Sequence, residues 1–176
     1  MRRRLLLPLL TAHLPAAGAG AAQDDAGATY VIVRHAEKAG DGERDPDLSA
    51  AGHERARRLA QRLDGADLVA VYTTDYRRTR QTVQPSAAGH GVEPATYDAR
   101  LPAADFAARL RDAHPRGTVL VAGHSNTVPD IVAALCACEV APMPDTEYDR
   151  LSTVHVAADG GARLAVARFG APAQTP

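Results

Sequence analysis

The 176-residue sequence has only two cysteines, Cys136 and Cys138. Two thiolates supply too few ligands for a zinc site of the cysteine and histidine kind. The spacing predicts a helix over 127–138, and residues two apart on a helix point to different sides. We therefore do not expect a disulfide between them, even in an oxidising compartment. Cys136 falls in the apolar series of this helix and is expected to pack in the core.

The sequence also lacks an excess of positive charge and a long apolar run. Its 20 basic and 21 acidic residues leave no basic face for a nucleic-acid backbone, so we expect no nucleic-acid partner. No apolar run reaches the ~20 residues of a membrane-spanning helix, so none is expected in the mature chain. No internal repeat and no linker rich in Pro, Gly or Ser divides the sequence, which predicts a single domain over 29–170.

Residues 1–22 have the pattern of a secretory signal peptide. A basic start is followed by a short apolar stretch, and small residues such as Ala19 and Ala21 lie where a signal peptidase cleaves. Removal of this segment leaves 17 basic and 21 acidic residues, a formal charge of −4. The pattern predicts a secreted or periplasmic protein.

Strand and helix patterns alternate along the rest of the chain. The apolar, β-branched run at 29–33 is typical of a strand buried on both faces of a mainly parallel sheet. Ser49 can cap a following helix that Gly65 closes, and Asp159-Gly160-Gly161 marks a late hairpin. The order predicts an α/β fold, a three-layer α/β/α sandwich with a mainly parallel mixed sheet. The further strands are expected at 67–73, 93–98, 118–122, 153–157 and 162–169, and the further helices at 76–88, 103–113 and 127–138.

Polar residues follow three of these strands, at the edge where open α/β sheets bind ligands. Arg34 and His35 follow the first strand, Arg78 the second, and His124 and Asn126 a later one. Arginine forks match phosphoryl oxygens, so these residues predict an anionic substrate. A histidine kept neutral by surrounding cations can attack phosphorus, and a second histidine can donate a hydrogen bond to the phosphoryl oxygens. Such a site requires no metal or other cofactor. Asn126 either donates to phosphate or caps the next helix.

Four motifs carry a resemblance to a known family. They are R-H-A-E-K (34–38), D-P-D-L-S-x-x-G (45–52), T-x-x-x-R-x-x-x-T (74–82) and G-H-S-N-T (123–127). Together they resemble the histidine phosphatase superfamily, which includes phosphoglycerate mutases and bacterial phosphohistidine phosphatases.

The resemblance implies a phosphoglycerate mutase-like fold, with His35 as the nucleophile that becomes phosphorylated. It also implies that Arg34 and Arg78 bind phosphate and that His124 is the second phosphate-binding histidine. The implied substrate is a small phosphorylated molecule or a phosphoprotein, cleaved at a phosphomonoester or phosphoramidate bond.

The sequence departs from the family at the proton donor. Many members have a glutamate after the third strand, whereas this chain has Asp98 there and Asp105 soon after. Asp98 is the first candidate for the acid that protonates the leaving group, and Asp105 is the second. A substrate with a good leaving group would need no such acid. Thr74 also replaces the usual serine of its motif. The long insertions that roof the pocket in larger members are missing, which predicts an open site.

Three other functions remain as alternatives. G-H-S-N-T resembles the nucleophile elbow of serine hydrolases, with Ser125 as nucleophile, but it lacks the final glycine and leaves only His155 as a later histidine. The missing glutamate is also compatible with a non-catalytic phosphoryl-binding protein of the cell envelope. Export and the absent insertions disfavour a phosphoglycerate mutase.

Overall fold

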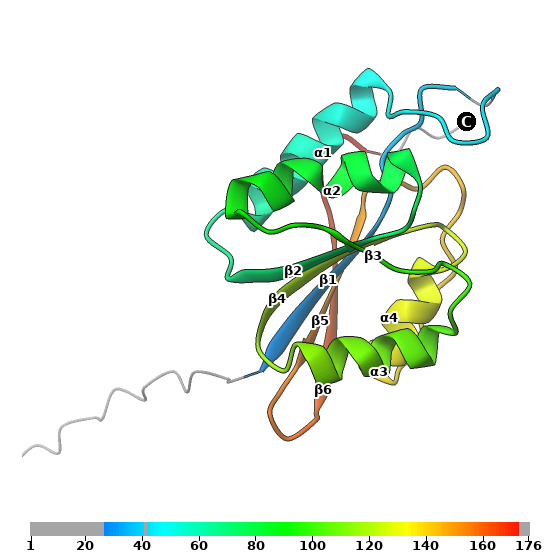
Figure 1. Ribbon diagram of the computed structural model, residues 1–176. Coiled ribbons are helices and arrows are strands. Elements are labelled where there is room, and N and C mark those ends of the chain that lie inside the picture. The colour runs from blue at the N-terminus through cyan, green and yellow to red at the C-terminus, as the bar shows by residue number, and fades with distance from the viewer. Residues whose placement is uncertain (1–26, 41, 173–176) are drawn as a thin grey trace, which may run out of the picture.

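The protein is built around one six-stranded mixed sheet with helices on both faces (Figure 1). The computed structural model describes residues 27–40 and 42–172, so the expected signal segment 1–22 lies outside the described residues. The strand order is β3-β2-β4-β1-β5-β6. The first four strands in this order run parallel, and β5 and β6 add an antiparallel finish. The predicted α/β/α sandwich is confirmed.

The observed elements lie close to the expected ones. The strands are β1 (Ala28–Arg34), β2 (Leu68–Thr73), β3 (Ala95–Thr96), β4 (Gly117–Gly123), β5 (Arg150–Val156) and β6 (Ala162–Arg168). The helices are α1 (Ala50–Leu63), α2 (Arg77–His90), α3 (Ala103–Ala113) and α4 (Val128–Cys136).

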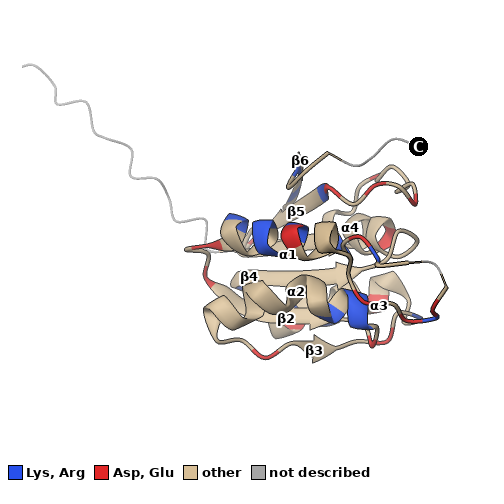
Figure 2. Ribbon diagram, turned by 90° about the horizontal axis from the view of Figure 1, so that it is seen from above, with Lys and Arg blue, Asp and Glu red and all other residues tan. Residues whose placement is uncertain are grey.

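Successive side chains of β1 point to opposite faces of the sheet, and both faces are covered by helices. Tyr30 and Ile32 pack in the cluster under α3 and α4, whereas Val31 and Val33 pack in the cluster under α1 and α2. Because both faces are buried, the strand reads as a continuous apolar run. The neighbouring β4, whose sequence GTVLVAG has no charged residue, is drawn in tan in Figure 2, and Figure 1 shows helices on both sides of it.

Helix α1 begins as the sequence indicated. Ser49 is the N-cap residue, and its side chain accepts a hydrogen bond from the backbone N–H of Gly52 at 3.1 Å. Gly52 has a second role, because a Cβ at this position would lie 2.3 Å from the carbonyl oxygen of Glu37. The glycine of the D-P-D-L-S-x-x-G motif therefore lets α1 pack directly against the segment that follows β1.

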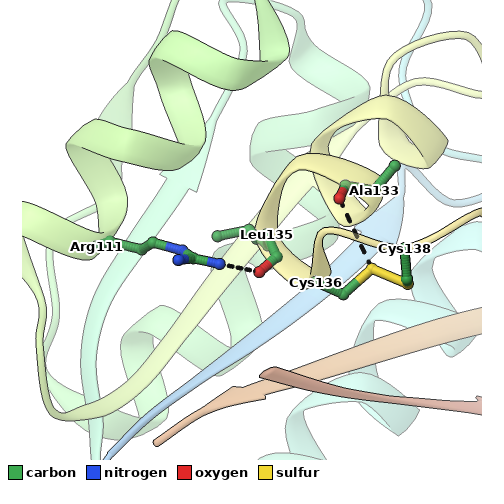
Figure 3. Close-up of a disulfide and its surroundings, with 5 residues drawn as sticks. All are labelled: Arg111, Ala133, Leu135, Cys136 and Cys138. Atoms are coloured by element: carbon green, nitrogen blue, oxygen red, sulfur yellow. Dashed lines mark hydrogen bonds between the residues drawn. A yellow bond between two sulfur atoms is a disulfide. The ribbon is translucent and has the colours of Figure 1, made fainter. Parts of the chain in front are cut away.

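Helix α4 corrects one expectation. It ends at Cys136, and Ala137 takes the left-handed conformation with φ 52°, so Cys138 lies beyond the helix. The two Cα atoms are 5.2 Å apart and the side chains form a disulfide (Figure 3). The prediction of unpaired cysteines was wrong because it assumed helical geometry through Cys138. Burial of Cys136 in the core is confirmed.

A buried ion pair ties the segment after β1 to α1 and to the residues that follow β6. The side chain of Arg55 is 3% exposed, and its guanidinium donates to both carboxylate oxygens of Glu37 at 2.7 to 3.1 Å. It also donates to the carbonyls of Phe169 (2.6 Å) and Ala171 (2.8 Å). Glu37 of the R-H-A-E-K motif therefore has a structural role, since it pairs with Arg55 of α1.

Replacing Arg55 with alanine is expected to lower the free energy of unfolding by about 3 kcal/mol, because the change leaves the partner carboxylate without its cation. Urea denaturation measures this loss. Arg58→Ala is the matched control, since Arg58 pairs with Glu54 on the solvent side of the same helix at 56% exposure. The control is expected to change the free energy by at most about 0.5 kcal/mol. Equal losses in the two variants would contradict a special role for the buried pair.

Candidate active site

The carboxyl ends of β1, β2 and β4 meet at one edge of the sheet. Arg34 lies opposite Gly123 in the β1–β4 register, and Thr73 lies opposite Ala122 in the β2–β4 register. A pocket of about 670 Å³ opens at this edge. The structure brings together five of the residues singled out from the sequence, all of which line this pocket: Arg34, His35, Arg78, His124 and Asn126.

His35 is buried and held in one tautomer. Its backbone N–H donates to the carbonyl of Gly123 at 2.9 Å, which extends the β1–β4 ladder by one residue. Its ring Nδ1 lies 2.8 Å from the carbonyl oxygen of Ala36. A carbonyl oxygen can only accept a hydrogen bond, so Nδ1 carries the proton and Nε2 keeps its lone pair. His35 therefore has the nitrogen that a nucleophile needs.

The surroundings keep both pocket histidines neutral. Burial lowers the pKa of His35 to about 3, and the nearby charge of Arg34 adds to this effect against the opposing bond to Ala36. Burial also lowers the pKa of His124 to about 4, helped by Arg78 and Arg34. The two rings lie 5.5 Å apart between centroids. At neutral pH neither ring carries a charge.

These pKa shifts predict how stability depends on pH. Between pH 6.5 and about 4 the unfolded chain binds protons at His35 and His124 that the folded protein does not bind, so the free energy of unfolding falls as the pH falls. His35→Asn is expected to make this slope shallower, by at most about 1.4 kcal/mol per pH unit. Urea denaturation across this range measures it, with the exposed His53→Asn as control. Identical slopes in wild type and His35→Asn would refute the shift.

A chain of hydroxyl groups fixes the tautomer of His124. The Thr79 hydroxyl donates to the carbonyl of Tyr76 at 2.8 Å and lies 2.8 Å from the Thr74 hydroxyl, which must then be the donor of that pair. The Thr74 oxygen is left to accept from Nε2 of His124 at 3.1 Å. A hydrogen bond from His124 to phosphate therefore requires the ring to leave Thr74 or to gain a second proton, which a bound dianion favours.

Arg34 is shared between the pocket and a neighbouring loop. Its Nη1 donates to the carbonyls of Pro144, Asp145 and Glu147 at 3.2, 2.7 and 3.3 Å. Its guanidinium carbon lies 4.1 Å from the centroid of the Tyr148 ring. Its Nε is buried without a hydrogen-bond partner among the described residues. Arg34 therefore holds the segment 144–148 over the pocket while keeping one unused donor.

Arg78 is stacked on a tyrosine in the same way as Arg34 but has fewer polar partners. Its guanidinium carbon lies 4.2 Å from the centroid of the Tyr76 ring, and its Nη1 lies 3.6 Å from a carboxylate oxygen of Asp45. Its Nε also has no hydrogen-bond partner in the described part of the chain. Each phosphate-binding candidate is thus stacked on a tyrosine, and both arginines line the pocket.

The two threonines of the T-x-x-x-R-x-x-x-T motif place Arg78 and the histidines. Thr74 contacts His124, as described above. Thr82 lies one helical turn after Arg78, where its hydroxyl donates to the Arg78 carbonyl at 2.7 Å and accepts from the backbone N–H of Ala36 at 2.9 Å. The motif therefore docks the start of α2 onto the residue that follows His35.

The two acids considered from the sequence do not reach the pocket. Asp98 pairs with Arg100 at 3.0 Å with its side chain 56% exposed, and Asp105 is exposed on α3. Neither lines the pocket, whereas Ala99 and Arg100 do.

The carboxylate among the described lining residues is Asp145, which the sequence analysis did not single out. The Ser125 hydroxyl donates to it at 2.7 Å, and this bond and the charge of Arg34 hold the pKa of Asp145 below its ordinary value. Asp145 and Tyr148 lie in the segment 137–149, which carries neither a strand nor a helix pattern. Nothing local in the sequence marked them.

Other residues of the G-H-S-N-T motif have separate roles. Thr127 is the N-cap residue of α4, and its hydroxyl accepts from the backbone N–H of His124 at 3.1 Å, so Asn126 does not cap this helix. His155 pairs with Thr29 at the amino end of β1, whereas Ser125 lies at the carboxyl end of β4. The structure does not bring Ser125 and His155 together as a serine hydrolase requires.

Two further features are missing from the described residues, namely a cluster of metal ligands and a membrane-spanning helix. Across 27–40 and 42–172, no three His, Cys, Asp or Glu side chains are grouped where they could hold a metal ion. Within the same ranges, no helix is long and apolar enough to cross a bilayer.

Comparison with known families agrees with this geometry. A sequence profile of the histidine phosphatase superfamily (branch 1) matches residues 30–108. The matched segment includes Arg34, His35 and Arg78 and ends before His124. A search of curated proteins with the sequence gives no significant match.

Solved structures of phosphatases share the fold. The protein histidine phosphatase SixA in complex with tungstate aligns with a TM-score of 0.64 at 22% identity, covering 81% of this chain and 96% of that chain. The SixA-like protein of Agrobacterium tumefaciens, described as a phosphohistidine phosphatase, gives 0.55 at 24% identity, with 81% and 97% covered. A mycobacterial glucosyl-3-phosphoglycerate phosphatase gives 0.61 at 17% identity, with 81% and 98% covered. At these identities the structural likeness establishes the fold alone.

Proposed function

We propose that this protein is a phosphatase that forms a phosphohistidine intermediate on His35 and needs no metal ion. The observation that carries the proposal is the state of His35. Its Nδ1 proton is bound to the Ala36 carbonyl, its Nε2 lone pair is free, and it shares a pocket with Arg34, Arg78 and His124.

The reaction proceeds in two displacements. In the first, Nε2 of His35 attacks phosphorus, the bond from phosphorus to the leaving group breaks, and the leaving group departs with the bonding electrons. In the second, water attacks the phosphohistidine, its P–N bond breaks, and inorganic phosphate leaves. The guanidinium groups of Arg34 and Arg78, which line the pocket, stabilise the negative charge on the phosphoryl oxygens in both steps.

The protonation state of the carboxylate in the pocket favours phosphoramidates such as phosphohistidine as substrates. Asp145 is ionised at neutral pH, so it can accept a proton from the attacking water but cannot donate one to a leaving alcohol. A phosphoramidate has a labile P–N bond and needs no acid from the protein. The likeness to two proteins described as phosphohistidine phosphatases supports the same choice.

A non-catalytic phosphoryl-binding protein is the second candidate. One observation favours it, namely that Asp98 and Asp105 lie outside the pocket. This protein would bind phosphate in the arginine and histidine pocket without turning over any substrate.

We also propose that the protein is exported. The basic and apolar pattern of residues 1–22 supports this, and so does the disulfide between Cys136 and Cys138, because disulfides persist mainly in oxidising compartments. Mass spectrometry of the protein recovered from periplasm and medium tests the proposal. Recovery of the uncleaved chain in the cytoplasm alone would refute it.

The deciding experiment compares hydrolysis of phosphoramidate and p-nitrophenyl phosphate by the protein lacking residues 1–22. We expect turnover of both, competitive inhibition by vanadate, and no effect of EDTA. Binding of phosphate without turnover of either substrate would favour the binding protein. Loss of activity in EDTA, restored by a metal ion, would show that the proposed chemistry is wrong.

A further inference from the structure

A second, smaller hollow adjoins the phosphate pocket. It has a volume of about 200 Å³ and lies between the starts of α3 and α4. Ala99 and Thr127 line both hollows, so they form the boundary between them. A molecule held by its phosphoryl group at His35 can therefore extend across this boundary without crossing the body of the protein.

The two hollows differ in chemistry. The phosphate pocket is lined by arginines, histidines and Lys38, whereas the smaller hollow is lined mainly by apolar side chains. Its apolar lining residues are Ala99, Leu101, Pro102, Ala103, Phe106 and Ile131, together with the ring of Tyr97.

Phe106 and Ile131 are each 3% exposed and belong to the core, which makes the floor of the small hollow rigid. Tyr97 stacks on Phe106 with ring centroids 4.2 Å apart, and burial raises the pKa of Tyr97, so its phenol stays neutral. Asp130 is the charged residue in the lining, and it is exposed.

The size and the walls fit one small apolar group. A cavity of about 150 Å³ with aliphatic and aromatic walls accommodates benzene. A phenyl ring or a branched aliphatic chain that leaves water for such a wall gains free energy in proportion to the apolar area covered. The leaving side of a bound substrate must point out of the arginine and histidine pocket, and this apolar hollow lies next to it.

We propose that the hollow between α3 and α4 binds an apolar group on the leaving side of the phosphorylated substrate. The proposal rests on the proposed function, because it requires the phosphoryl group to lie at His35. The apolar group is a phenyl-sized or leucine-sized substituent, which can belong to a small molecule or to a residue next to a phosphorylated side chain.

Two phosphonates, which resist hydrolysis, separate this proposal from the proposed function. Isothermal titration calorimetry compares methylphosphonate, which fills the phosphate pocket alone, with benzylphosphonate, which adds a phenyl ring. We expect wild type to bind benzylphosphonate about tenfold more tightly. Ala103→Leu fills the hollow and should remove this preference while leaving methylphosphonate binding unchanged. Ala104→Leu adds the same side chain at the next, exposed position of α3 and should keep the preference.

Each outcome decides one of the two claims. Equal binding of the two phosphonates by wild type would overturn the apolar subsite and leave the proposed function standing. Loss of the preference in both variants would also overturn it, since the effect would not come from the hollow. Failure of wild type to bind methylphosphonate would refute the phosphoryl pocket and the subsite together.

Peptides distinguish the two sources of the apolar group. Initial rates are compared for histidine-phosphorylated peptides with leucine or glycine next to the phosphorylated residue. A leucine preference that Ala103→Leu removes would assign the hollow to protein substrates. Equal rates together with tight binding of benzylphosphonate would assign it to small molecules.

Discussion

Replacement of His35 by alanine is expected to reduce the rate of phosphate release by at least about 1000-fold, because the variant lacks the imidazole nitrogen that attacks phosphorus. The Nε2 of His124 is bound to Thr74, and the hydroxyl of Ser125 is bound to the Asp145 carboxylate. The measurement is the initial rate of phosphoramidate hydrolysis at neutral pH. An acid-labile phosphoryl group trapped on wild type by base quenching should be missing from the variant.

The control for this prediction must exclude a folding defect. His35 is 4% exposed, so its removal opens space behind the pocket. His35→Asn keeps a similar volume, and its circular dichroism spectrum should match that of wild type. His53→Ala changes an exposed histidine of α1 and should keep full activity. Turnover of His35→Asn at the wild-type rate would refute the assignment of the nucleophile.

The parts of the fold that the sequence predicted well are those specified by local patterns. The buried strand β1 reads as an uninterrupted apolar run because side chains on both faces are covered. Helix α1 has a capping residue at Ser49 and apolar residues at spacings of three and four. Parallel strands bring their carboxyl ends to one edge, so the meeting of Arg34, His35 and His124 followed from the strand order.

The disulfide could not be predicted in the same way. It depends on the left-handed backbone of Ala137, and alanine has no preference for this conformation. A glycine at this position would have marked the end of the helix. Without that signal, the apolar pattern of α4 continued through Cys136 and on to Cys138.

The loop that carries Asp145 and Tyr148 was also beyond sequence reasoning. Its position over the pocket comes from three backbone carbonyls that accept hydrogen bonds from Arg34, more than 100 residues earlier in the chain. Every residue has a backbone carbonyl, so hydrogen bonds to carbonyls cannot be recognised from the side chains in the sequence. Asp98 was considered as the acid from its place after β3, but its carboxylate pairs with the nearby Arg100.

Arg78 is expected to produce the second largest effect. Arg78→Ala should lower kcat/KM by about 100-fold to 1000-fold, because it removes donors that stabilise the phosphoryl oxygens in the transition state. Arg80→Ala is the matched control on the same helix, since Arg80 is 46% exposed and pairs with Asp75. We expect the control to remain within about twofold of wild type, as for most surface substitutions. Equal losses in the two variants would contradict the selection of Arg78.

Arg78→Lys separates the charge of Arg78 from its geometry. The cation contributes to the lowered pKa of both His35 and His124, so its removal in Arg78→Ala should let both values rise toward 6.5. Lysine keeps the charge but cannot form two parallel hydrogen bonds. Arg78→Lys should therefore have low activity with histidine titration, followed by NMR, close to that of wild type. An unchanged histidine titration in Arg78→Ala would mean that burial alone keeps the nucleophile neutral, and Arg78 would then act only by binding the phosphoryl group.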